Sequence, residues 1–139
     1  VEIRICDTIP NLKDIVDLAA LIQSLVVGLC NHYEDGTQLP YLDSWIIYEN
    51  KWRATRYGMD ANIITDADGS QVPIREIIKQ TILALDPEVN QLNVGESMDR
   101  LIGRLDNKKA YYEDQLNLYK KNNNFTDVIK NNIDTLKGS

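Results

Sequence analysis

The stretch from Asn11 to about Cys30 constrains the fold most, because its apolar residues recur on almost every side of a helix. Pro10 stands at or near the first position of this predicted helix, where its missing N–H costs nothing. The apolar positions are Leu12, Ile15, Val16, Leu18, Leu21, Ile22, Leu25, Val26 and Leu29. A helix that is apolar on nearly every side is usually buried. A chain of 139 residues offers few elements to surround it, so we expect further structure to cover this helix.

The first residues predict a β-strand, because Val1 to Cys6 alternates with period 2 and is rich in β-branched residues. On such a strand Glu2 and Arg4 share one face and lie roughly 7 Å apart, at a rise of about 3.3 Å per residue. A carboxylate can ligate Mg²⁺, and a guanidinium can hold a carboxylate or phosphate through two parallel hydrogen bonds. The pair therefore suits a site where a metal-bound phosphate meets an anionic substrate. The same pattern is also typical of a cross-strand ion pair on a solvent-facing sheet.

The rest of the chain predicts a mostly helical α+β structure with one small hairpin. In order, we expect a polar loop over 31–40, a helix from Tyr41 to about Tyr57 ended by Gly58, a hairpin of 62–65 and 71–73 around an Asp-Gly turn, and a helix over 74–85 stopped by Asp86-Pro87. Residues 88–137 predict three helices, broken near 93–95, 106–107 and 122–124.

Composition limits the partners. The net charge of −6 and the pI near 4.7 argue against nucleic acid as the main partner, because phosphate binding rewards clustered Lys and Arg. No apolar run approaches the roughly 20 residues that span a bilayer, so we expect no membrane partner. Cys6 and Cys30 stand in apolar settings without a metal or disulfide pattern, which predicts a reducing cytoplasm. His32 is the only histidine, which disfavours a histidine triad or a multi-histidine metal site within this chain.

A second candidate cluster lies on the predicted helix before Gly58. Glu49, Arg53 and Arg56 share a face by the i, i+4, i+7 rule, and Asn50 lies on the adjacent face. Two arginines with an asparagine near a helix end can bind an anion. The alternative is a surface ion pair between Glu49 and Arg53 beside a packing stripe. That stripe would consist of Trp45 and Trp52.

Other polar and aromatic residues predict local structure rather than chemistry. Asp14 and Asp17 are typical of charge early in a helix, and the Asp66/Asp68 pair is typical of a turn. We interpret neither pair as a metal site. The tyrosines 111, 112 and 119 are most simply explained by helix packing.

Three motifs together resemble the glutamate–cysteine ligase type 2, or carboxylate–amine ligase, family. They are Val-Glu-Ile-Arg-Ile-Cys-Asp-Thr-Ile-Pro over 1–10, Asp-Leu-Ala-Ala-Leu-Ile-Gln over 17–23, and Glu-Asn-Lys-Trp-Arg-Ala-Thr-Arg-Tyr-Gly over 49–58 with Asp-Ala at 60–61. The resemblance continues more loosely through 72–76 and the closing helices. The motifs are specific in combination and not one by one.

The resemblance implies an ATP-dependent ligase that forms an amide through an acyl phosphate, on a fold related to glutamine synthetase and the guanidino kinases. Glu2 would then ligate Mg²⁺, and Arg4 would be catalytic, steadying phosphate or a substrate carboxylate. The family signature at Asn50, Arg53 and Arg56 implies substrate or phosphate binding, without a role for each member. The implied cofactors are ATP and Mg²⁺, and the implied partners are small amino acids such as glutamate and cysteine.

The resemblance also bears on how the chain is organised. We expect residues 1–139 to form one C-terminal fragment of a larger catalytic domain, inactive when isolated, because the family's other metal and nucleotide contacts lie upstream. A separately encoded N-terminal half would explain the same sequence. The alternative function is a non-catalytic helical module for assembly or regulation that keeps the family residues as scaffold. Uncovered apolar helix surface is compatible with a homo-oligomer.

Overall fold

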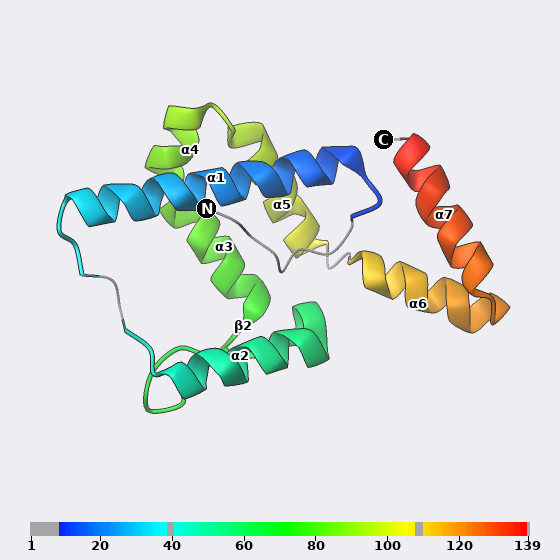
Figure 1. The fold of residues 1–139 in the computed structure, drawn as a ribbon, viewed down its shortest axis with the longest axis horizontal. Coiled ribbons are helices and arrows are strands. Elements are labelled where there is room, and N and C mark those ends of the chain that lie inside the picture. Colours follow the sequence, from blue (N-terminus) through cyan, green and yellow to red (C-terminus); the bar gives the residue numbers. More distant parts are fainter. Residues whose placement is uncertain (1–8, 39–40, 108–109, 139) are drawn as a thin grey trace.

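The chain folds into helices and one small antiparallel hairpin (Figure 1). The computed structural model describes residues 9–38, 41–107 and 110–138. The elements are α1 (Leu12–Glu34), α2 (Ser44–Tyr57), the 3-10 helix η1 (Gly58–Asp60), β1 (Asn62–Ile64), β2 (Gln71–Pro73), α3 (Ile74–Ala84), α4 (Asp86–Leu92), α5 (Gly95–Asp106), α6 (Tyr111–Asn122) and α7 (Phe125–Lys137). The strand predicted over 1–7, with Glu2 and Arg4, lies outside the described residues.

The first helix is longer than predicted. Asn11 caps it, its side chain accepting the Asp14 N–H at 3.1 Å, so Pro10 precedes the helix instead of opening it. The loop predicted from residue 31 is wrong at its start, because α1 continues to Glu34 and the backbone first takes a positive φ after the helix at Gly36. His32 is therefore an exposed helical residue. No helix among the described residues is both long and apolar enough to cross a membrane.

The boundaries of the remaining elements lie close to their predicted positions, because they depend on local turn and helix-end preferences. Gly58 ends α2 with φ +56°, and a Cβ there would lie 2.9 Å from the Tyr112 hydroxyl oxygen, so only glycine fits. The predicted hairpin is confirmed, and its register pairs Ile63 with Val72. α3 ends at Ala84, and Pro87 opens the short helix α4 within the stretch expected to stop α3. The breaks near 93–95, 106–107 and 122–124 are confirmed, and in the described part of the chain four helices follow α3 instead of the predicted three.

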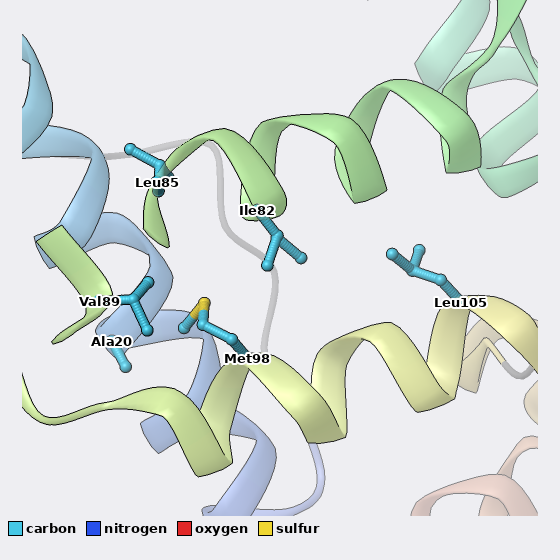
Figure 2. Close-up of a cluster of buried hydrophobic side chains, with 6 residues drawn as sticks. All are labelled: Ala20, Ile82, Leu85, Val89, Met98 and Leu105. Carbon is cyan, nitrogen blue, oxygen red and sulfur yellow. The ribbon is translucent and has the colours of Figure 1, made fainter. Parts of the chain in front are cut away.

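The hydrophobic core lies where α1 crosses α3, α4 and α5 (Figure 1). Figure 2 shows its buried side chains, which are Ala20, Ile82, Leu85, Val89, Met98 and Leu105. The other side of α1 stays uncovered by the described residues, with Ile15, Val16 and Leu29 between 41% and 54% exposed. Cys30 is exposed as well, so the apolar setting predicted for it is wrong in this chain.

A buried ion pair joins α1 to α5. Asp17 is fully buried, and its carboxylate accepts from Arg100 Nε at 2.9 Å and from Nη2 at 2.6 Å. Ser97 also accepts from the same Nη2 at 3.1 Å. The hydrogen bond from Arg100 holds the pKa of Asp17 below its ordinary value, more than burial raises it. Both charges are thus satisfied inside the packed region.

A second ion pair lies next to the first along the same two helices. Asp14 pairs with Arg104 and accepts from the Tyr111 hydroxyl, and the Arg104 guanidinium lies 4.6 Å from the centroid of the Tyr111 ring. Asp14 does lie in the first turn of α1, as predicted, but helix-start charge does not account for the ion pairs that Asp14 and Asp17 form with α5. Both carboxylates point from α1 toward α5, where arginines more than eighty residues away in sequence neutralise them.

We predict that Asp17→Asn lowers the free energy of unfolding by about 3 kcal/mol, because it leaves Arg100 partly buried without its counter-charge. Urea unfolding followed by circular dichroism measures this loss. The matched control is Asp106→Asn, which breaks the exposed Lys79–Asp106 pair and should cost under about 1 kcal/mol. Equal losses in the two variants would contradict a special role for the buried pair.

The lowered pKa of Asp17 also predicts how stability depends on pH. The unfolded carboxyl titrates near pH 3.9 and the folded one lower, so the unfolded chain binds more protons in that window. The contribution of Asp17 is complete above about pH 4 and is lost as pH falls through its folded pKa. The stability difference between the wild type and Asp17→Asn should therefore narrow below about pH 4. A difference that stays constant from pH 7 to pH 2 would refute this linkage.

Candidate anion-binding site on α2 and the hairpin

The Asn50 side chain links α2 to the hairpin through two hydrogen bonds. Its Nδ2 donates to the Ile64 carbonyl at 2.8 Å, and its Oδ1 accepts the Ile64 N–H at 2.8 Å. The side-chain amide thus pairs with one residue of β1 as a neighbouring strand would. Ile46, four residues before Asn50 on the same helix, is fully buried. Asn50, a predicted site residue, therefore holds β1 in place against α2.

Arg53 bridges three elements. Its Nε donates to Glu49 Oε1 at 2.8 Å, and its Nη1 donates to the Asn62 carbonyl at 3.2 Å and to Gln71 Oε1 at 2.7 Å. The predicted Glu49–Arg53 pair is confirmed, but the guanidinium also ties both strands to the helix. Nη2 has no hydrogen-bond acceptor among the described residues. The guanidinium is thereby held in one position with one nitrogen still able to donate.

Arg56 differs from Arg53, although both lie on α2. Its side chain is exposed in the last helical turn, with the guanidinium 5.8 Å from the centroid of the Tyr57 ring. No carboxylate within the described ranges forms an ion pair with it. Trp52 contacts Tyr57 edge-to-face at 5.8 Å but remains 53% exposed, and Trp45 is 54% exposed. The two tryptophans are therefore not buried as a packing stripe by the described residues.

A groove of about 560 Å³ opens beside Arg53. Its lining residues are Trp45, Tyr48, Glu49, Arg53 and Ile64. Guanidinium groups bind carboxylates and phosphates through paired hydrogen bonds. The exposed Arg56 adds a positive charge on the same helix that has no ion-pair partner among the described residues. The arrangement can hold an anion near Arg56 and a less charged group in the groove, where Glu49 partly neutralises Arg53.

The metal prediction depends on residues elsewhere in the chain. Within 9–38, 41–107 and 110–138, no three His, Cys, Asp or Glu side chains gather closely enough to hold a metal ion. Glu2, the predicted Mg²⁺ ligand, and Arg4, the predicted catalytic residue, lie outside those ranges. Asp66 forms turn chemistry as expected: it accepts the Ser70 N–H at 3.0 Å, and its hydrogen bonds to Ser70 lower its pKa.

Arg75 is a polar residue that the sequence interpretation missed. Its side chain is 15% exposed, Nη1 donates to the Leu105 carbonyl at 3.4 Å, and Nη2 lies 3.8 Å from an Asp60 oxygen. Nε and Nη2 have no hydrogen-bond partner among the described residues. Periodicity could have revealed it, because Arg75 shares the i, i+3, i+7 face of α3 with Ile78 and Ile82, which pack in or against the core.

Comparison with known proteins points to one family. The profile of the glutamate-cysteine ligase family 2 matches residues 1–130. The chain is 38% identical over 129 residues to a Thermobifida fusca protein provisionally named glutamate–cysteine ligase 2, covering 93% of this chain and 32% of that protein. It is 36% identical over 115 residues to a Nocardia farcinica protein provisionally named glutamate–cysteine ligase 2-2, covering 83% and 30%.

A protein of Mycobacterium tuberculosis, also provisionally named glutamate–cysteine ligase 2, is 38% identical over 97 residues, covering 70% of this chain and 26% of that protein. The chain thus spans between 26% and 32% of the length of these curated relatives. Because the family profile covers nearly the whole sequence, including both motifs that carry the candidate site residues, the chain belongs to the glutamate–cysteine ligase family 2.

Proposed function

We propose that the chain supplies the C-terminal part of the active site of an ATP-dependent carboxylate–amine ligase. The observation that carries the proposal is the family profile, which runs through the 1–10 and 49–58 motifs. The geometry of α2 supports it, because the exposed Arg56 has no carboxylate partner among the described residues and is available to an anion, while Arg53 keeps Nη2 as a hydrogen-bond donor beside it. The relatives' names suggest glutamate as the carboxylate substrate and cysteine as the amine.

The proposed reaction has two steps. A carboxylate oxygen of glutamate takes the terminal phosphoryl group of ATP, and ADP leaves. The cysteine nitrogen then attacks the acyl carbon, phosphate leaves with the former carboxylate oxygen, and the nitrogen loses a proton as the C–N bond forms. Negative charge moves between oxygens in both steps, so fixed positive groups provide much of the catalysis.

The residues of α2 divide this work in the proposal. Arg56 contacts the phosphate or the substrate carboxylate, because its charge is exposed and unpaired within the described part of the chain. Arg53 offers Nη2 as a hydrogen-bond donor, and the hydrogen bonds of its Nε and Nη1 keep that donor in one position. Asn50 was predicted as a substrate contact, but its amide is engaged with Ile64, so we assign it the placement of β1 relative to α2.

The proposal also covers the Mg²⁺ site, the wider fold and the cellular location. Mg²⁺ would be held through Glu2 and further ligands, and we assign no metal step to the described residues because they contain no suitable cluster. Arg4 would steady phosphate beside it. The fold would be related to glutamine synthetase and the guanidino kinases, with the ligase acting on small amino acids in the cytoplasm.

We predict that the full-length ligase releases ADP when glutamate and cysteine are both supplied, whereas this chain alone does not. The isolated chain contains about a third of the length of its relatives, and its described residues contain no metal-binding cluster. A coupled ADP-release assay on both proteins measures the difference. Glutamate-dependent ATP hydrolysis by the chain alone would contradict the prediction. A full-length protein that releases no ADP with any amino acid would instead favour a non-catalytic module.

We predict that Arg56→Ala in the full-length ligase lowers kcat/KM by about ten- to a hundredfold, the range expected for losing one hydrogen-bonded charge contact. Lys51→Ala is the matched control, because Lys51 is also an exposed cation on α2 but points away from the Arg56 face. Neither change should alter the thermal unfolding midpoint by more than a few degrees. Equal activity losses in the two variants would refute a specific role for Arg56.

A further inference from the structure

The groove beside Arg53 has an aromatic wall. Trp45 and Tyr48 line it and are 54% and 73% exposed, which is unusual for side chains with so much apolar surface. The two residues are three positions apart on α2, so their rings lie on one face of the helix. Such rings present π-faces on which flat heteroaromatic rings stack, and the strength of that stacking depends little on the identity of the base.

The groove also has a polar edge with a defined hydrogen-bond pattern. Glu49 Oε1 accepts from Arg53 Nε, while Oε2 has no partner among the described residues. Arg53 Nη2 likewise has none, although Nε and Nη1 are engaged with Glu49, Asn62 and Gln71. An acceptor and a donor therefore stand side by side, and three hydrogen bonds keep the donor in place.

We propose that this groove receives the adenine ring of the nucleotide. The exocyclic amine of adenine would donate to Glu49 Oε2, the neighbouring ring nitrogen would accept from Arg53 Nη2, and the ring would stack on Trp45 or Tyr48. Proteins read the same donor–acceptor pair of adenine in DNA through a side-chain amide. The inference rests on the proposed function, since it assigns a place to the base of the ATP that the ligase would consume.

The chemistry of the groove favours a base over the other substrate groups. A phosphate would be repelled by the Glu49 carboxylate, which partly neutralises Arg53, so it is better placed at Arg56. A zwitterionic amino acid would satisfy the charge pair but leave both aromatic faces in water. Only a flat ring with a donor amine beside an acceptor nitrogen uses every feature of the groove.

The test is a titration of the chain with adenosine, which carries no phosphate, followed by the two indole N–H signals in ¹⁵N–¹H NMR spectra. Adenosine should shift the Trp45 signal and leave the Trp52 signal in place. Inosine, which has an oxygen in place of the amine, should bind at least about tenfold more weakly. Trp45→Ala should weaken adenosine binding by about tenfold, whereas the matched Trp52→Ala should not.

A second variant keeps the test decisive if Trp45→Ala disturbs the fold. Glu49→Gln retains the shape of the side chain but can both donate and accept, so it should reduce the preference for adenosine over inosine. Equal shifts from adenosine and inosine, a shift of the Trp52 signal alone, or a Trp45 signal that responds to glutamate and not to adenosine would each overturn the proposal.

Two further results separate this inference from the proposed function. ADP release by the full-length ligase without adenosine binding at Trp45 would leave the ligase assignment standing and reject the adenine site. Adenosine binding at Trp45 together with a full-length protein that forms no amide would keep the adenine site and reject the ligase reaction.

Discussion

The carboxylate of Asp17 is fully buried on α1, and the guanidinium of Arg100 on α5 meets it through two hydrogen bonds. An unpaired charge in that position would cost several kcal/mol, so the pairing fixes how far apart the two helices lie and how they are rotated. Asp14 and Arg104 repeat the arrangement further along the same helices. The core that α1 forms with α3, α4 and α5 thus has its register set by charge as well as by packing.

The site on α2 depends on a different kind of constraint. Two short strands contribute little stability by themselves, because an isolated hairpin is marginal in water. Asn50 and Arg53 supply what the hairpin lacks, by hydrogen-bonding to Ile64, Asn62 and Gln71 from the neighbouring helix. These polar residues of the 49–58 motif therefore hold α2 and the hairpin together. The remaining hydrogen-bond donors extend from this pair of elements. In the proposed ligase, Arg53 would hold the hairpin and also offer a donor to a bound group.

The sequence predicts the features of this structure that depend on neighbouring residues. The left-handed backbone at Gly58, the Asp-Gly hairpin turn and the asparagine-rich helix breaks all follow from conformational preferences within a few positions. The partners of Asp14 and Asp17 do not, because they lie more than eighty residues away and periodicity does not encode them. In the candidate site, the Glu49–Arg53 pair was predictable from helical spacing, whereas the contacts of Asn50 depend on where β1 is placed.

In the proposed ligase, Arg53 and Arg56 would act differently on a bound anion. A charge pair 4 Å apart is worth about 1 kcal/mol in water and about 4 kcal/mol near a protein surface of lower effective dielectric. Arg56 lies in the last turn of α2, where the helix dipole disfavours anions, so its charge must outweigh that field. Trp45, Tyr48 and Trp52 leave the adjoining surface apolar and open. Covering that surface would exclude water and strengthen the attraction of Arg56 for a phosphate. The same residues would therefore bind phosphate weakly when exposed to water and tightly when enclosed.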